Sequence, residues 1–188
     1  MRLSPPSFAS RAGSRGILSR VLATTAIAFA LCLSIASARA GEEALSTAPD
    51  FTGKDLDGKT YQLKELLAKG PVLLNFWATW CKPCMLELPE VQKLWDKYKD
   101  QGFNFVTVTY DDAKSVAQVK PKAKSMGFRF PVLLDPEHKI ASPYSVRNCP
   151  TSFLIGQDGK IISVAQGYRP GDEKKLEEEI LKLLPKKS

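Results

Sequence analysis

The sequence of 188 residues predicts an α/β fold with a mixed central sheet flanked by helices. Short apolar runs rich in β-branched and aromatic residues alternate with amphipathic helical patterns, which is typical of parallel strands joined by crossover helices. Near the C-terminus two strand-like runs are separated only by a short Gln-Asp-Gly turn, which indicates one antiparallel pair. A hydrophobic content of 44% suits one globular domain with an appendage.

The N-terminal half of this domain predicts a β-hairpin, a short helix, and then one strand followed by a long helix. An Asp-Gly pair between two strand-like pieces indicates the hairpin over 50–62, after a polar lead-in at 41–49 that we expect to be flexible. Residues 63–67 fit one or two helical turns. Residues 72–77 are almost entirely apolar and too short for a helix, so they predict a buried strand. Beyond the strand, apolar residues recur at spacings of three and four to about residue 102, which predicts the long helix.

The C-terminal half continues this alternation. Residues 103–110 indicate a buried parallel strand, and 111–125 are helical in character with a possible kink at Pro121. A strand at 128–134 and a short helix or turn at 137–147 follow. Residues 151–155 and 160–166 are the two hairpin strands, and 172–184 form an amphipathic helix that has Asp172 as a plausible N-cap.

Cys81 and Cys84 stand where the strand 72–77 passes into the long helix. At the helix N-terminus, free N–H groups and the macrodipole stabilise a thiolate on the first sulfur. Cys84 comes one turn later, shielded by the first sulfur and close enough to form a small disulfide ring. Pro83 lies in the first turn, where no N–H is needed, and Trp77 and Trp80 are expected to form an apolar rim. The pattern predicts a redox pair with Cys81 as nucleophile and Cys84 as resolving thiol.

Glu87 follows Cys84 by three residues and therefore lies on the same helical face, one turn away. A carboxylate there could accept the proton that Cys84 loses when it resolves a mixed disulfide, which is general base catalysis. The alternative is an ordinary charge on a helix surface.

Other functions of the cysteines stay open. A structural zinc site needs two further ligands, and only Cys149 and His138 are available after residue 40; an inert structural disulfide is another possibility. A carrier of a soft metal ion such as Cu(I) could use Cys81, Cys84 and Cys149, because thiolates favour such ions.

At FWATWCKPC, at the following Glu-x-Pro of Glu87 and Pro89, and at the later CPTSFLIGQDGKI, the chain resembles the thioredoxin superfamily. It is most similar to the exported TlpA/ResA-like branch, which includes the cytochrome c maturation reductases. The resemblance covers nearly all of residues 45–184. It implies a thioredoxin-like fold with an N-terminal hairpin and a central helix-strand insertion over 111–134.

The resemblance also implies an activity. The protein is expected to be an enzyme, a thiol-disulfide oxidoreductase that reduces protein disulfides through a Cys81–Cys84 dithiol/disulfide cycle with a mixed disulfide intermediate. Cytochrome c or copper-site maturation is the implied process, and a membrane-bound electron donor is the implied source of electrons. No cofactor and no resident metal are expected. A peroxidase is less well supported, because peroxiredoxins place Thr or Ser three residues before the reactive cysteine, where Cys81 is preceded by Ala78 and Cys84 by Cys81 itself.

Several site residues rest on the resemblance. It implies a cis peptide bond before Pro150 and places this proline against the cysteine motif, where it keeps a substrate backbone in register. Trp80, Pro83 and Cys149 are further expected substrate contacts. Asn75 stands where cytosolic thioredoxins carry a buried aspartate, and because an amide cannot titrate, the proton transfer falls to Glu87 or water.

Cys149 has three possible roles, since its sulfur is expected near Cys81. It could be a buried inert thiol, which behaves as a small hydrophobe. It could instead exchange with the Cys81–Cys84 pair, or ligate a metal ion.

Residues 1–40 predict a cleavable signal peptide. Four arginines precede the apolar stretch 21–36, and Ala38-Arg39-Ala40 provides the small residues that signal peptidase requires. The mature domain would be 41–188, periplasmic or otherwise exported and soluble; the alternative is a membrane anchor formed by 21–36.

The net charge of +7 falls to about +2 without the five arginines of residues 1–40, because these forty residues contain no acid. A nearly neutral domain gives no electrostatic reason to expect a nucleic acid partner. The expected partners are protein disulfides or thiols, and the expected state is a monomer.

Overall fold

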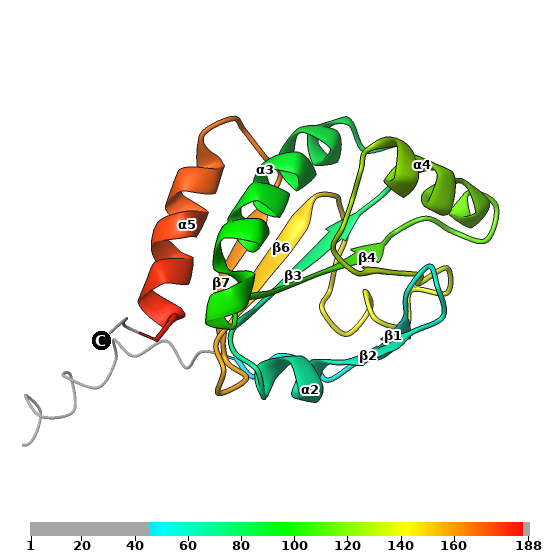
Figure 1. Ribbon diagram of the computed structural model, residues 1–188. Coiled ribbons are helices and arrows are strands. Elements are labelled where there is room, and N and C mark those ends of the chain that lie inside the picture. The colour runs from blue at the N-terminus through cyan, green and yellow to red at the C-terminus, as the bar shows by residue number, and fades with distance from the viewer. Residues whose placement is uncertain (1–45, 186–188) are drawn as a thin grey trace, which may run out of the picture. The chain divides into compact units, whose positions relative to one another are not determined.

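A computed structural model describes residues 46–185 of the chain. The predicted signal peptide or anchor at 1–40 lies outside these residues. Figure 1 shows the arrangement of the labelled elements. In chain order they are β1 (Thr52–Lys54), β2 (Thr60–Gln62), α2 (Leu63–Leu67), β3 (Val72–Trp77), α3 (Lys82–Tyr98), β4 (Asn104–Thr109), α4 (Val119–Ser125), β5 (Val132–Leu133), β6 (Thr151–Ile155), β7 (Ile161–Gln166) and α5 (Asp172–Leu183).

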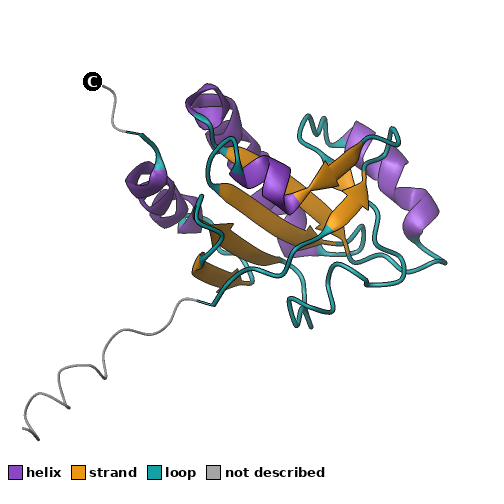
Figure 2. Ribbon diagram, turned by 90° about the horizontal axis from the view of Figure 1, so that it is seen from below, coloured by secondary structure: helices purple, strands orange, loops and turns teal. Residues whose placement is uncertain are grey.

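Five strands form the central sheet in the order β5-β4-β3-β6-β7. The strands β3, β4 and β5 are parallel, and β6 runs antiparallel to both β3 and β7. The strands β1 and β2 form a separate antiparallel hairpin. The predicted mixed sheet with flanking helices and an N-terminal hairpin is therefore confirmed (Figure 2).

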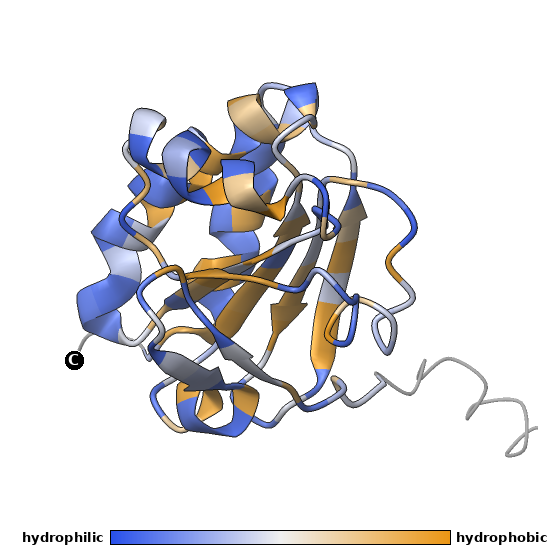
Figure 3. Ribbon diagram, turned by 90° about the vertical axis from the view of Figure 1, so that its right-hand side faces the viewer, coloured by the Kyte–Doolittle hydropathy of each residue, from blue (hydrophilic) through white to orange (hydrophobic). Residues whose placement is uncertain are grey.

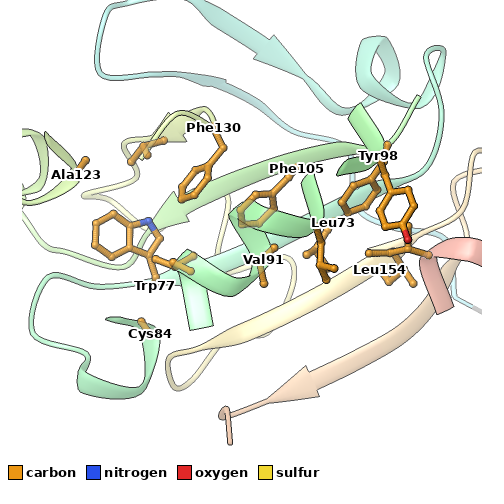
Figure 4. Packing of buried hydrophobic residues seen from close by; sticks show 14 of the residues in the cluster. Leu73, Trp77, Cys84, Val91, Tyr98, Phe105, Ala123, Phe130 and Leu154 are labelled. Carbon is orange, nitrogen blue, oxygen red and sulfur yellow. The ribbon is translucent and has the colours of Figure 1, made fainter. Parts of the chain in front are cut away.

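The central strand β3 is buried along its whole length and separates two hydrophobic cores. Side chains alternate between the faces of a strand, so Leu73 and Trp77 face the core under α3 and α5, together with Phe105 and Leu154 of the neighbouring strands. Figure 4 shows this core, with Trp77 at the end where Cys84 lies. The hydrophobic residues concentrate in the sheet, and the helices are hydrophobic only in part (Figure 3).

The opposite face of β3 packs against α2 and irregular segments, and Val72, Leu74 and Phe76 point toward it. The lead-in contributes to this face, because Thr47 forms a β-bridge with Lys160 and the Ala48 N–H donates to the Gly159 carbonyl. The expectation of a flexible lead-in at 41–49 is thus wrong for its last residues, which are held by the turn before β7.

The central insertion is less regular than predicted. The helix α4 covers only the second half of 111–125. Pro121 lies in its first turn, where a missing N–H breaks no helical hydrogen bond. The predicted strand 128–134 is reduced to the two residues of β5. Residues 137–147 form turns. The Ile140 and Ala141 N–H groups there donate to the Asp135 carboxylate and not to helical carbonyl groups.

At the C-terminal helix, the N-cap is Gly171 and not Asp172. The Asp172 carboxylate accepts a hydrogen bond from the Arg169 N–H at 2.8 Å, so it closes the preceding turn instead of capping the helix. Among residues 46–185, no helix has both the length and the apolar character that crossing a bilayer requires.

Two leucines of α3 provide a test of this packing. Leu88 is fully buried against the sheet, whereas Leu86 is 58% exposed. We expect Leu88→Ala to lower the free energy of unfolding by about 2–5 kcal/mol through loss of apolar contact and the resulting cavity, and Leu86→Ala to change it by less than about 0.5 kcal/mol. Denaturant unfolding of the oxidised protein measures both. Equal effects of the two substitutions would show that α3 does not pack in this orientation.

Candidate redox active site

Cys81 and Cys84 form a disulfide with their Cα atoms 5.4 Å apart. Cys81 is the N-cap of α3, and its sulfur accepts a hydrogen bond from the Cys84 N–H at 3.2 Å. A free helix N–H aimed at a sulfur stabilises negative charge there, so the position supports a thiolate on Cys81. Cys81 is 4% exposed and Cys84 is fully buried. Of the two sulfurs, the one on Cys81 is therefore the more accessible to a substrate.

The surroundings of the disulfide agree only in part with the predicted apolar rim. Trp80 is 62% exposed and Pro83 is also exposed, so both are available for substrate contact. Trp77 is fully buried, its indole N–H donates to the Thr107 hydroxyl at 3.2 Å, and its ring packs edge-on against Phe128. The expectation that Trp77 lies in the rim is wrong, because strand alternation turns it into the core under α3.

Pro150 is buried at the head of β6, and the peptide bond before it is cis, as expected. The register pairs Phe76 of β3 with Thr151 of β6, so continuing it by one residue sets Pro150 beside Trp77, close to the cysteine motif. The Pro150 carbonyl accepts a hydrogen bond from the Gly167 N–H at 2.8 Å. Two sheet strands therefore bring together the motif and a proline that is far from it in sequence.

Glu87 is 5% exposed and lies beneath the motif, between α3 and the sheet. Its carboxylate accepts hydrogen bonds from the Asn75 amide at 2.9 Å and the Ser152 hydroxyl at 3.1 Å. Burial raises the pKa of Glu87 from 4.5 to about 7, although these two hydrogen bonds oppose the shift and the Asp172 charge adds to it. A carboxyl group with a pKa near neutrality is suited to exchange a proton at physiological pH.

A cavity of about 290 Å³ lies between β7 and α5, and Glu87 and Ser152 form part of its wall. This volume is large enough for several water molecules. Its other polar lining groups include Ser163, Asp172 and Glu179. The buried carboxyl group is therefore connected to a polar space on the side of the sheet that α5 covers.

Of the two residues that donate hydrogen bonds to Glu87, the sequence pattern indicates Asn75 but not Ser152. Asn75 is the one polar residue in an apolar strand, and its amide also donates to the Ser152 hydroxyl at 2.8 Å. Its role is thus to hold Glu87 and not to titrate. Ser152 was not predicted, because only the pairing of Asn75 with Ser152 across β3 and β6 reveals that both face α3.

Asp111 is a second buried carboxylate that the sequence analysis did not identify. It follows β4 and accepts two hydrogen bonds from Thr79, one from the hydroxyl at 2.6 Å and one from the backbone N–H at 2.9 Å. Its only sequence signal is a polar pair at the carboxyl end of a buried strand, where functional side chains of parallel sheets gather.

Cys149 is a free thiol and partly buried. Burial raises the pKa of Cys149 most, and together with the smaller effects of the Asp111 and Glu87 charges it brings this pKa to about 12. At neutral pH it is therefore a neutral thiol, which neither attacks disulfides nor binds metal well. Between residues 46 and 185, no group of three or more His, Cys, Asp and Glu side chains is arranged to hold a metal ion. His138 instead stacks on the Tyr110 ring, with ring centroids 4.2 Å apart.

Comparison with known proteins gives consistent results. Residues 45–164 match the AhpC/TSA family. The chain is 41% identical over 138 residues to the thiol-disulfide oxidoreductase ResA of Bacillus cereus, covering 73% of this chain and 77% of the relative. A Chlorobium tepidum structure assigned to the DsbE thiol:disulfide interchange proteins has a TM-score of 0.68 and 33% identity, covering 73% of this chain and 95% of that one.

The peroxidoxin BcpB of Mycobacterium tuberculosis has a TM-score of 0.61 at 24% identity, covering 73% of this chain and 94% of that one, which shows a common fold alone. The similarities to ResA and to the interchange protein confirm the resemblance that the motifs indicated.

Glu87 makes folding stability depend on pH. Its pKa in the folded state lies above the ordinary value of 4.5, so the folded protein binds this proton more tightly than the unfolded chain. The contribution is fully present below about pH 4.5 and is lost as the pH rises through about 7. Relative to Glu87→Gln, oxidised wild type should lose about 3 kcal/mol of stability across this window.

Denaturant unfolding at several pH values measures this difference. Glu90→Gln, the same change at a less buried site on α3, is the matched control. The difference in stability between wild type and Glu90→Gln should not follow this pH trend. A difference between wild type and Glu87→Gln that stays constant from pH 4.5 to 8 would contradict a raised pKa for Glu87.

Cys149→Ala tests whether the third cysteine participates. Because the thiol is neutral and partly buried, we expect the reduction potential of the Cys81–Cys84 couple to shift by less than about 10 mV, which is below 1 kcal/mol for two electrons. Equilibration with glutathione measures the potential, and copper titration of the reduced protein measures metal binding. A larger shift, or loss of stoichiometric Cu(I) binding, would assign Cys149 to exchange or to a metal site.

Proposed function

We propose that this chain, which belongs to the AhpC/TSA family and is a ResA-like thiol-disulfide oxidoreductase, is exported and reduces disulfides in other proteins. The observation that carries the proposal is the placement of the cysteine pair: Cys81 caps α3, its sulfur accepts an N–H, and Glu87 lies buried one turn beyond Cys84. This arrangement supports one nucleophilic sulfur, one protected sulfur and a nearby proton acceptor.

In the first step, the Cys81 thiolate of the reduced protein attacks a substrate disulfide. A bond forms between the Cys81 sulfur and one substrate sulfur, and the other substrate sulfur leaves as a thiolate. The helix N-terminus and the Cys84 N–H lower the cost of holding negative charge on Cys81. The neighbouring Lys82 adds a positive charge on the exposed side of the motif.

In the second step, Cys84 attacks the Cys81 sulfur of the mixed disulfide. The Cys81–Cys84 disulfide forms, the second substrate sulfur leaves as a thiolate, and the substrate has gained two electrons. Cys84 is fully buried, so losing its proton requires an acceptor close by. Glu87, with a pKa of about 7, is the proposed general base, and the cavity between β7 and α5 gives it contact with water.

The substrate would lie over the exposed part of the motif. Trp80 and Pro83 are exposed there, and the Cys149–Pro150 segment lies beside it. We propose that these residues form the substrate-binding surface and that Pro150 keeps the substrate backbone in register. A tryptophan that is 62% exposed offers a large apolar contact for a partner.

Export and the physiological process complete the proposal. Residues 1–40 have the arginines, apolar core and small-residue cleavage site of a signal peptide, which supports the proposal that the domain 41–188 is exported to the periplasm or outside the cell. A reductase in an oxidising compartment needs a supply of electrons, and a membrane-bound donor is the proposed source. Cytochrome c or copper-site maturation is the proposed process, since both require reduced cysteines in a target protein.

Peroxide reduction is the second candidate, because residues 45–164 match the AhpC/TSA family. The residue three positions before Cys81 is Ala78, which has no hydroxyl to bind a peroxide. Peroxide consumption by the reduced protein at a rate comparable to its disulfide reduction would favour this second function.

The Cys84→Ser variant tests the order of the two steps. Without the resolving thiol, Cys81 should form mixed disulfides that persist, so the variant should retain substrate proteins that wild type releases. The matched Cys81→Ser variant should retain few or none. Thiol trapping in cells, followed by identification of the bound proteins by mass spectrometry, measures both and names the substrate. Stronger trapping by Cys81→Ser would reverse the assigned roles.

A further inference from the structure

Asp111 is fully buried at the carboxyl end of β4, and thiol-disulfide exchange as described above leaves it without a role. The parallel register pairs Trp77 with Thr109, so continuing it by two residues sets Asp111 opposite Thr79. Both carboxylate oxygens are used: Oδ1 accepts from the Thr79 hydroxyl at 2.6 Å, and Oδ2 accepts from the Thr79 N–H at 2.9 Å. This two-point contact determines both the position and the orientation of Thr79.

Thr79 belongs to the short segment that connects β3 to the nucleophile. The segment is held at both ends, because the Trp77 carbonyl accepts from the Tyr110 N–H at 2.6 Å and the Cys81 N–H donates to the Ala78 carbonyl at 3.1 Å. Between these ends, the contacts from Asp111 hold Thr79, two residues before Cys81. The residue two positions before the nucleophile is therefore held by a side chain from the segment that follows β4.

A buried carboxylate is a costly way to make such a contact, since removing a charge from water requires compensation by strong hydrogen bonds. Both bonds to Thr79 are of the charge-assisted kind, which are shorter and stronger than neutral ones. The Asp111 charge also contributes to the raised pKa of Cys149, so the carboxylate lies near both segments of the proposed substrate surface. These contacts are strong and geometrically defined, and they lie at the segment that leads to Cys81.

Two other aspartates show what a purely structural role looks like. Asp135 is also buried, and its carboxylate accepts from the Ile140 and Ala141 N–H groups in the turns after β5. Asp112 is exposed and accepts from the Lys114 and Ser115 N–H groups of its own turn. Through these bonds, neither aspartate contacts the segment before Cys81. Asp135 is therefore a control for losing a buried carboxylate, and Asp112 is a control for losing a negative charge.

We propose that Asp111 is a positioning residue for thiol-disulfide exchange: acting through Thr79, it holds the Thr79–Cys81 segment in the orientation from which the Cys81 sulfur attacks. The inference rests on the proposed role of Cys81 as nucleophile. It assigns Asp111 no contact with substrate and no proton transfer. Its effect is on the rate of attack, because misplacing a nucleophile by about 1 Å can reduce a rate by about 100-fold.

The test uses the 41–188 protein and two measurements. The first is kcat and KM for reduction of insulin disulfides with dithiothreitol as electron donor. The second is the rate of iodoacetamide alkylation of reduced Cys81 as a function of pH, which separates the pKa of Cys81 from the limiting reactivity of its thiolate. Rates are normalised to the folded fraction, determined by denaturant unfolding.

We expect Asp111→Ala to lower kcat by about 10- to 100-fold with a smaller change in KM, and to lower the limiting thiolate reactivity as well. Asp111→Asn keeps an acceptor for the Thr79 N–H and should restore most of the rate. Thr79→Val removes only the hydroxyl and should cost less than Asp111→Ala. The double variant should be no slower than Asp111→Ala, because both act through one contact. Asp135→Ala and Asp112→Ala should keep the wild-type rate per folded molecule.

Additive effects of Asp111→Ala and Thr79→Val would overturn the proposal, as would a rate loss for Asp111→Ala no larger than that of Asp135→Ala. If Asp111→Ala does not fold, Thr79→Val carries the test, because it removes the 2.6 Å contact alone: a limiting thiolate reactivity equal to wild type in this variant would contradict the proposal. The outcome is separable from the proposed function, since a wild-type protein that fails to reduce insulin would refute the reductase while the alkylation rates still report on positioning.

Discussion

The pairing register of β3 with its two neighbours is the constraint on which the rest of the site depends. On one side, the antiparallel pairing with β6 places Asn75 opposite Ser152, and both then hold Glu87 from beneath α3. On the other side, the parallel pairing with β4 brings Asp111 level with Thr79. A shift of either register by one residue would turn these polar groups to the opposite face of the sheet. The sheet thus aligns the chemistry as well as the core.

The sulfurs of Cys81 and Cys149 experience opposing electrostatic influences. The N-terminus of α3 favours negative charge on Cys81, which caps the helix. At Cys149 the pKa is raised, first by burial and then by the charges of two buried carboxyl groups, Asp111 and Glu87. The structure therefore supports a thiolate on Cys81 at the helix end and keeps the Cys149 thiol neutral. The environments of Cys81 and Cys149 therefore favour different protonation states of the two thiols.

The hydrophobic core also contributes to the site, because the disulfide lies at its edge. Cys84 belongs to the same cluster of buried residues as Trp77 and Leu88, so the resolving sulfur is kept from water by the packing of α3 on the sheet. Burial makes ionisation of this thiol expensive. It also raises the pKa of Glu87 to about 7, where a carboxyl group can still accept a proton at neutral pH. Burial beneath α3 thus creates the need for the proposed base and also raises the pKa of the carboxyl group proposed for that role.

The sequence alone determined the fold class and the position of the cysteine pair, because both depend on local patterns: alternating apolar runs and helical spacings, and a Cys-x-x-Cys where one pattern changes to the other. Tertiary structure alone decided that Trp77 is buried and not part of a rim, that Pro121 lies in the first turn of α4, and that Ser152 contacts Glu87 and Asp111 contacts Thr79. These features depend on which residues of distant strands lie opposite one another. A single chain pattern indicates that a strand exists, but the register between strands is set by the joint packing of both faces of the sheet, which no local segment contains.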